Sequence, residues 1–228
     1  MTTCFPNLSL PFASAARRAA GAFFGLAVVT WLASANPARA QLGSLHQVQV
    51  KDTSALHPPA GARVAIVEFD DLECPFCAQA NPTLMQAAAH YKIPWVRHDF
   101  LIPGHIWSPT AAVYARWFDA KNKALGDDYR NQIFANQSSI ETLGEMNQFT
   151  QIFAASHGTA LPFALDPQGK FAAAVQADTD LAHSMGLIET PTIFVVMANA
   201  KGTPYIQVLD IDRDLYSDID KALAATRH

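Results

Sequence analysis

The chain has 228 residues, and half of them are hydrophobic, which is enough to bury one sizeable core. It carries 16 basic residues against 20 acidic ones, a formal net charge of −4. An acidic protein without a basic patch is not expected to bind nucleic acid, so that class of function is excluded.

The first 40 residues have the pattern of a targeting signal. Arg17 and Arg18 precede an apolar run, AAGAFFGLAVVTWLASA, and the tripeptide ARA at 38–40 fits a cleavage site. We predict a secretory signal peptide over residues 1–40, cut after Ala40, which leaves a soluble, periplasmic or otherwise exported protein. The alternative is an uncleaved N-terminal membrane anchor, because the apolar run approaches the ~20 residues of a spanning helix.

Only Cys74 and Cys77 remain after cleavage, because Cys4 lies within the signal. A structural disulfide across two residues closes a very short loop and would stabilise the fold little. Zinc needs about four ligands, and the eight histidines are scattered without an H-x3-H pair beside the cysteines. We therefore predict no metal site and a redox function for the pair.

The residues around the cysteines predict a strand followed by a helix. The run Val64–Phe69 is apolar and β-branched, as in a buried strand, and Pro75 suits the first position of a helix. Cys74 then lies at the helix N-terminus, where free N–H groups and the helix dipole lower the pKa of a thiol below ~8.5. Cys77, one turn later, is expected to be more buried. We predict that Cys74 attacks as a thiolate and that Cys77 resolves the mixed disulfide.

The rest of the chain alternates between strand and helix patterns. Further strands are predicted within 93–102, 191–198 and 205–211. Helices are predicted after Ser108-Pro109, after a capping box at Ser138–Glu141, after Asp166-Pro167 as far as Gly186, and after a cap at Asp212. The predicted order is β, α, β, a block of helices, β, β, α.

This order, with C-x-x-C opening the first core helix, resembles the DsbA-like thiol:disulfide oxidoreductases. The resemblance implies an α/β fold, a thioredoxin-like fold with an inserted helical subdomain, over residues 61–228. The insertion is expected at about 104–187, and residues 41–60 form an N-terminal extension. The matching features are Glu68 six residues before Cys74, Pro82 five after Cys77, and the segments GLIETPTIFVV and FLIPGHIWSPTAAVYA.

The resemblance also implies site residues. Pro191 corresponds to a cis-proline that faces the cysteines, and Thr190 before it offers backbone groups to an extended client. Pro75 and Phe76, between the cysteines, are expected to contact clients as well. Without the resemblance, Pro191 would be interpreted as an ordinary trans proline that starts a strand.

Glu68 is expected to be a buried acid, because the surrounding run VAIVEF is apolar on both faces of the strand. Burial would raise its pKa, so that it could relay the proton of Cys77. The alternative is an exposed strand residue. We therefore predict three catalytic residues, Cys74, Cys77 and Glu68.

Several other residues near the predicted site are assigned no catalytic role. Trp95, His105 and Trp107 are expected in the core or at a helix entry rather than in catalysis. Arg97 and His98 point to opposite faces of their strand, and neither is assigned a role.

The dipeptide between the cysteines bears on how strongly the pair oxidises. Phe76 offers no cation, and Glu73 adds a negative charge beside Cys74. We therefore expect a weaker oxidant than a relative with histidine in place of Phe76.

The function implied is disulfide exchange with the cysteine pairs of client proteins, with the protein acting as a disulfide donor. Alternatives are a disulfide isomerase or reductase, or a redox-inert binding or folding-helper protein. About twenty residues before the first strand are too few for the association domain of dimeric isomerases, which indicates a monomer. No cofactor is expected, and a membrane redox partner would reoxidise or reduce the pair.

Overall fold

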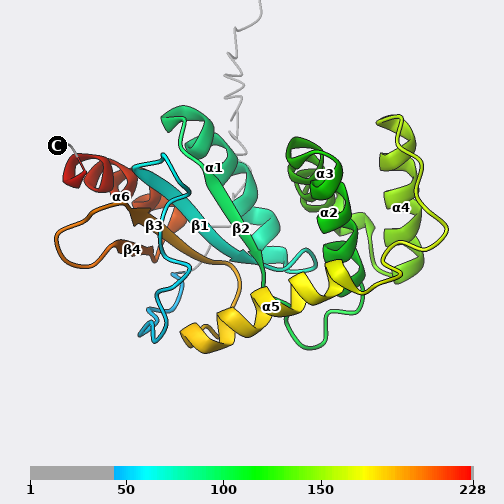
Figure 1. The fold of residues 1–228 in the computed structure, drawn as a ribbon, viewed down its shortest axis with the longest axis horizontal. Coiled ribbons are helices and arrows are strands. Elements are labelled where there is room, and N and C mark those ends of the chain that lie inside the picture. Colours follow the sequence, from blue (N-terminus) through cyan, green and yellow to red (C-terminus); the bar gives the residue numbers. More distant parts are fainter. Residues whose placement is uncertain (1–43, 227–228) are drawn as a thin grey trace, which may run out of the picture. The chain divides into compact units, whose positions relative to one another are not determined.

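A computed structural model describes residues 44–226, so the predicted signal peptide lies outside the described part of the chain. The order of elements agrees with the one predicted from the sequence (Figure 1). The elements are β1 (Val64–Asp70), α1 (Pro75–Tyr91), β2 (Trp95–Asp99), α2 (Ser108–Lys121), α3 (Lys123–Asn136), η1 (Gln137–Ser139), α4 (Leu143–Ser156), α5 (Lys170–Met185), β3 (Thr192–Met197), β4 (Tyr205–Val208) and α6 (Ile211–Ala225).

The four strands form one mixed sheet in the order β2-β1-β3-β4. β1 is parallel to β2 and antiparallel to β3, and β3 is antiparallel to β4. Every residue of β1 and β3 is buried, because helices cover both faces of the sheet. Figure 1 shows α1 and α6 over one face and α5 over the other.

Side chains of β1 alternate between these two faces. Val64 and Ile66 pack with α1 and α6, whereas Ala65 and Val67 pack in the cluster that includes α5. The same alternation continues into the polar end of the strand. Glu68 and Asp70 therefore lie on the face that α1 covers.

The helices α2 to α5 are inserted between β2 and β3 and have a core of their own. Phe118 of α2, Tyr129 of α3 and Phe153 of α4 pack against one another with ring centroids 4.8 to 5.2 Å apart. Cys74 and Cys77 belong to the same buried cluster. The two sulfurs consequently lie where the sheet half of the fold meets the helical insertion.

Two predicted helix caps are wrong by one or two residues. Ser108 is the first helical residue of α2 rather than its cap, and the Glu73 carboxylate accepts from the N–H groups of Trp107 and Ser108 at 2.7 and 3.0 Å. At α6 the cap is Asp210, which has extended backbone angles and accepts from the Arg213 N–H. Asp212 lies inside the first turn, where it cannot act as the cap.

The capping box of α4 is also four residues later than predicted. Thr142 Oγ1 accepts from the Glu145 N–H at 3.2 Å, and the Glu145 carboxylate accepts from the Thr142 N–H at 2.9 Å. The predicted box at Ser138–Glu141 instead overlaps the short 3-10 helix η1. Both segments have the same S/T-x-x-E pattern, so the pattern alone did not separate them.

The two remaining differences concern helix starts. α5 begins at Lys170, after Gly169, while the Asp166 carboxylate accepts from the Ala172 N–H from outside the helix. α3 was not predicted as a separate helix; it is capped by Asn122, whose side chain accepts from the Ala124 N–H.

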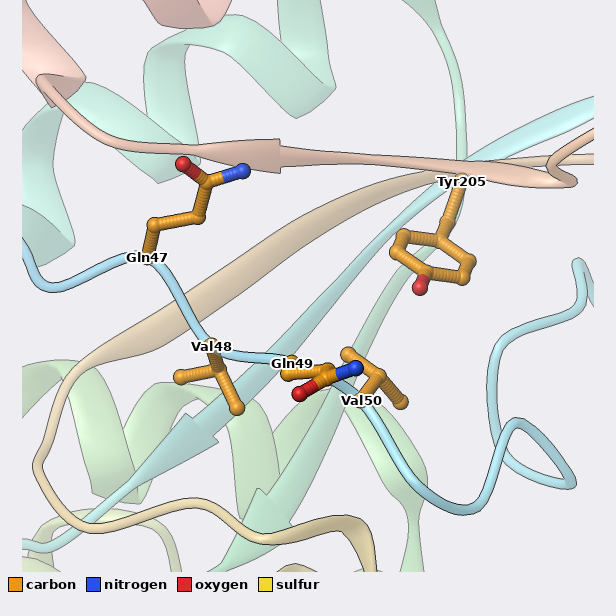
Figure 2. A pocket seen from close by; sticks show the side chains of 5 residues that line it. All are labelled: Gln47, Val48, Gln49, Val50 and Tyr205. Atoms are coloured by element: carbon orange, nitrogen blue, oxygen red, sulfur yellow. The ribbon is translucent and has the colours of Figure 1, made fainter.

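The N-terminal extension runs beside β4 and the end of the sheet. The Leu45 N–H donates to the Leu209 carbonyl at 2.7 Å, and the Gln207 amide contacts both the His46 carbonyl and the Val48 N–H. Figure 2 shows the pocket that residues 47–50 line together with Tyr205. Over residues 44–226, no helix has the length and apolar character needed to cross a membrane.

Gly126 allows the close approach of α3 to α2, and its replacement tests that contact. A Cβ at Gly126 would lie 2.0 Å from Asp119 Oδ1 and 2.8 Å from the Asp119 backbone nitrogen. The Asp119 carboxylate is held by Arg130, so it cannot move aside freely. We expect Gly126→Ala to lower the free energy of unfolding by about 1–3 kcal/mol, measured by urea denaturation.

Gly144, in the first turn of α4, is the matched control. The nearest atom to a Cβ there is Thr142 Oγ1 at 3.7 Å, an ordinary contact. Gly144→Ala is expected to leave stability unchanged or raise it by up to about 1 kcal/mol. Equal effects of the two substitutions would contradict the steric explanation.

Candidate active site

Cys74 occupies the N-cap position of α1, as predicted, and Pro75 is the first helical residue. The Cys74 N–H donates to the Asp71 carbonyl at 2.9 Å, which closes the turn between β1 and α1. From the helical insertion, the Gln137 amide donates to the carbonyls of Leu72 and Cys74 at 2.8 and 3.0 Å. The turn that carries Cys74 is therefore fixed from both halves of the fold.

The two sulfurs have very different surroundings. Cys74 is 4% exposed and Cys77 is fully buried, and the two thiols are not joined in this structure. A hydrogen bond from the Cys77 side chain lowers the pKa of Cys74 to about 6, with the Thr190 side chain and the N–H groups of Cys77 and Phe76 acting in the same direction. Burial raises the pKa of Cys77 well above its ordinary value. Cys74 is the thiolate of the pair at neutral pH.

The Thr190 main chain lies directly against Cys74, and Pro191 follows it. The Thr190–Pro191 peptide bond is cis, as predicted. The Thr190 carbonyl oxygen is 3.3 Å from Cys74 Sγ, so the main chain of this loop borders the sulfur. On the helix side, Pro75 and Phe76 are exposed, and Phe76 keeps 53% of its surface accessible.

Glu68 is completely buried, which confirms the prediction of burial and rules out the exposed alternative. The Trp95 indole N–H donates to Glu68 Oε2 at 3.0 Å, and Arg97 Nε lies 3.8 Å from the same oxygen. Burial, followed by the charge of Asp70, raises the pKa of Glu68 to about 8. The carboxyl is therefore largely protonated at neutral pH and able to exchange a proton there.

Asp70 and Arg97 are the functional candidates that the sequence analysis missed. Asp70 is 1% exposed and lies on the same face of β1 as Glu68, and Arg97 lies opposite them on β2. Arg97 Nε is 3.7 Å from Asp70 Oδ2. The alternation of β1 could have placed Asp70 beside Glu68 on one face. Placing Arg97 there required the register in which Glu68 pairs with Arg97, and no local pattern indicates that register.

The other residues considered from the sequence have structural contacts. His98 pairs with Asp178 at 2.9 Å and stacks on Phe69, on the opposite face of the sheet from Arg97. His105 Nδ1 lies 3.0 Å from Asp71 Oδ1. Trp107 is buried in the core of the insertion, as expected.

Two expectations about Trp95 and Glu73 need correction. Trp95 is half-buried, but its indole N–H bonds the buried acid rather than only filling the core. Glu73 was expected to act on Cys74 through its negative charge. Its carboxylate is turned to the N-terminus of α2 instead, where two backbone N–H groups bond it.

Within residues 44–226, no three side chains of His, Cys, Asp or Glu gather closely enough to hold a metal ion. The chemistry available to this site comes from the thiols, the buried carboxyls and the backbone of the loop at Thr190.

A family model described as thioredoxin matches residues 59–203. By sequence, the chain is 27% identical over 188 residues to the Na(+)/H(+) antiporter NhaA 3 of Salinispora tropica. That match covers 75% of this chain but only 28% of the antiporter.

Solved structures share the fold at low sequence identity. Alpha-DsbA1 of Wolbachia pipientis has a TM-score of 0.60 at 16% identity, over 80% of this chain and 94% of that one. ScsC of Proteus mirabilis has a TM-score of 0.58 at 16% identity, over 73% and 71%. A periplasmic thioredoxin-like protein of Salmonella enterica has a TM-score of 0.57 at 18% identity, over 73% and 88%. These similarities confirm the predicted thioredoxin-like fold with a helical insertion.

The hydrogen bond between the two sulfurs can be tested by removing one of them. Cys77 is the largest cause of the lowered pKa of Cys74, so Cys77→Ala should raise that pKa towards ~8.5. The measurement is the pH dependence of Cys74 alkylation by iodoacetamide, which follows the thiolate fraction.

Phe76→Ala in the same Cys77-containing chain is the control, since it keeps the backbone N–H that contributes to the pKa of Cys74. Phe76→Ala should leave the pH dependence of Cys74 alkylation unchanged. An unchanged profile in Cys77→Ala would show that the sulfur contact does not set the pKa.

Proposed function

This chain belongs to the thioredoxin family, and on that premise we propose that it is an exported thiol:disulfide oxidoreductase acting on cysteine pairs of client proteins. The observation that carries the proposal is the asymmetry of its two sulfurs. Cys74, with a pKa of about 6, lies at a helix N-terminus beside the Thr190 main chain, and Cys77 is buried behind it. A thiolate nucleophile next to a buried resolving thiol is the arrangement that disulfide exchange requires.

The exchange proceeds in two displacements. A client thiolate attacks Cys74 Sγ of the oxidised protein, the Cys74–Cys77 bond breaks, and Cys77 leaves as a thiolate that takes up a proton. The client's second thiolate then attacks the client sulfur of the mixed disulfide, and Cys74 leaves as a thiolate. The client loses two electrons and gains a disulfide, and the cysteine pair is reduced. In this scheme Glu68 is the acid that supplies the proton to Cys77.

Clients dock along the loop at Thr190–Pro191 in an extended conformation. Main-chain groups of Thr190 supply binding with little dependence on client sequence, as in other strand-like docking modes. Pro75 and the exposed ring of Phe76 add an apolar surface beside the nucleophile. This combination suits a catalyst that accepts many clients.

Disulfide donation is the direction we propose. The reduced form is stabilised because Cys74 is a thiolate at neutral pH, and such stabilisation favours transfer of the disulfide to the client. The predicted signal peptide, together with a fold shared with a periplasmic protein, supports export to a compartment where disulfides persist. A membrane redox partner would then reoxidise the pair. Isomerase or reductase activity is the alternative.

Substitution of each cysteine tests the roles separately. Cys74→Ser should abolish oxidation of a reduced model protein, because the Cys74–Cys77 disulfide that is donated can no longer form. When Cys77→Ser is mixed with a client that already carries a disulfide, mixed disulfides should accumulate, because the Cys74 thiolate attacks the client disulfide and no Cys77 thiol displaces it; these can be detected on non-reducing gels. Full activity in Cys74→Ser would refute the proposal, and insulin reduction that outpaces oxidation would favour the reductase alternative.

The residue before Cys77 tests how oxidising the pair is. In Phe76→His a cationic side chain would lie near the Cys74 thiolate, so the pKa of Cys74 should fall below about 6. The equilibrium with glutathione should shift towards the reduced form by about tenfold for each pKa unit, and Phe76→Leu is the neutral control. If both variants change client choice but leave the pKa in place, Phe76 is only a docking surface.

A further inference from the structure

Two acids, rather than one, lie buried behind the cysteine pair. Glu68 and Asp70 are two residues apart on β1, so both side chains point to the face covered by α1. Arg97 faces both of them, with Nε 3.8 Å from Glu68 Oε2 and 3.7 Å from Asp70 Oδ2. All three side chains are at least nine-tenths buried. The guanidinium is therefore shared between two carboxyls.

Several polar atoms of this cluster have no hydrogen-bond partner within the described chain. Both carboxyl oxygens of Asp70 and Oε1 of Glu68 are among them, together with Nε and one terminal nitrogen of Arg97. The other terminal nitrogen of Arg97 donates to the Asn81 and Asn131 side chains. Asp70 is thus a buried acid whose oxygens bind no donor, an unfavourable state for an ionised carboxylate.

The charges around the two acids come from four elements. They are Asp71 after β1, Arg97 and Asp99 on β2, Arg130 on α3, and Cys74 and Cys77 at the start of α1. Arg130 is bonded by Asp119, and Asp99 is bonded by Arg116. Arg97 is the cation near both Glu68 and Asp70, while Arg130, already paired with Asp119, also lowers the pKa of Asp70 through its charge. Two buried carboxyls beside one shared cation cannot both be ionised at low energetic cost, so one proton stays on the pair.

The cluster also acts on the resolving thiol. The negative charges that raise the pKa of Cys77 are those of Cys74, Asp70 and Glu68, with Asp70 ahead of Glu68. Burial raises the pKa of Asp70 itself to about 7, near that of Glu68. The charge of Asp70 therefore acts on the pKa of the Cys77 thiol at least as strongly as that of Glu68, the acid identified from the sequence.

We propose that Asp70 and Glu68 form one carboxyl pair that holds a single shared proton and exchanges it with Cys77 during disulfide exchange. This inference rests on the proposed function and adds a second acid to it. When the Cys74–Cys77 bond breaks, the leaving Cys77 thiolate takes the proton and the pair becomes doubly ionised beside Arg97. The pair then regains a proton from solvent. In the reverse direction the Cys77 thiol returns its proton to the pair.

The first test uses the unaltered protein and does not depend on activity. Carbon-13 NMR of labelled Asp and Glu carboxyls in the reduced protein should show both carbons responding to the same two titration steps. The second step should lie near pH 7 to 8, where the pair loses its shared proton. Independent single steps, or two carboxylates already ionised at pH 6, would overturn the proposal.

The second test uses variants that keep the side-chain shape, Asp70→Asn and Glu68→Gln. The measurement is the rate at which a reduced client peptide reduces the disulfide as a function of pH. In each variant the remaining acid loses a neighbouring negative charge, so its pKa falls. The decline of the rate at high pH should move down by roughly one pH unit. The double variant should lose this decline and be about 100-fold slower than the native protein.

Asp218→Asn is the matched control for these variants. Asp218 is a buried acid on α6 that bonds Lys221 and is not among the groups facing Cys77. Asp218→Asn should leave the pH dependence of the exchange rate unchanged, even if the substitution lowers the stability of the protein. A native profile in Asp70→Asn together with loss of the high-pH decline in Glu68→Gln would mean that Glu68 acts alone. Absence of exchange in the native protein would instead defeat the proposed function, and the carboxyl titration would still decide the pair.

Discussion

Buried charge at the carboxyl ends of β1 and β2 is the constraint around which the rest of this structure is arranged. An ion moved from water into a protein interior costs several kcal/mol unless a partner compensates it. Arg97 is met by Asn81 of α1 and Asn131 of α3, and Asp99 is met by Arg116 of α2. The position of each surrounding helix therefore follows partly from which charge it must satisfy.

Further hydrogen bonds tie the helical insertion to the turn that carries Cys74. Gln137, next to α3, holds the turn before Cys74 through two carbonyls, and Glu73 of that turn bonds the N-terminus of α2. The insertion thus shapes the entry to α1 instead of merely covering it. A change in the packing of the insertion would be transmitted to Cys74 through two sets of hydrogen bonds: those that the Gln137 side chain donates to the turn, and those that the Glu73 carboxylate accepts from α2 and the residue before it.

Much of the site could be predicted because its signals are local. Pro75 at a helix start placed Cys74, and the apolar run around Glu68 indicated burial. The cis bond before Pro191 came only from a family resemblance, since no local pattern distinguishes it from a trans proline.

What could not be predicted depended on tertiary structure. Ser138 and Thr142 begin equivalent capping patterns, and only tertiary packing selects Thr142 as the N-cap of α4. The predicted strand ended at Phe69, whereas β1 continues through Asp70 and buries it. The partnership with Arg97 required the strand register, which a single sequence does not contain. The sequence contains Glu68, Asp70 and Arg97 as two acids and a cation, but it does not show that the three are neighbours.

The N-terminal extension has a consequence for how the protein avoids pairing with other chains. β4 is one of the two outer strands of the sheet, with β2 at the opposite edge, and an uncovered outer strand is a template for intermolecular pairing. Here the Leu45 N–H bonds the Leu209 carbonyl just past β4, and the Gln207 side chain holds the extension at His46 and Val48, so the extension lies beside this strand. The extension therefore leaves less of the β4 edge open to strand pairing with another chain, a protection that comes from residues preceding the first strand.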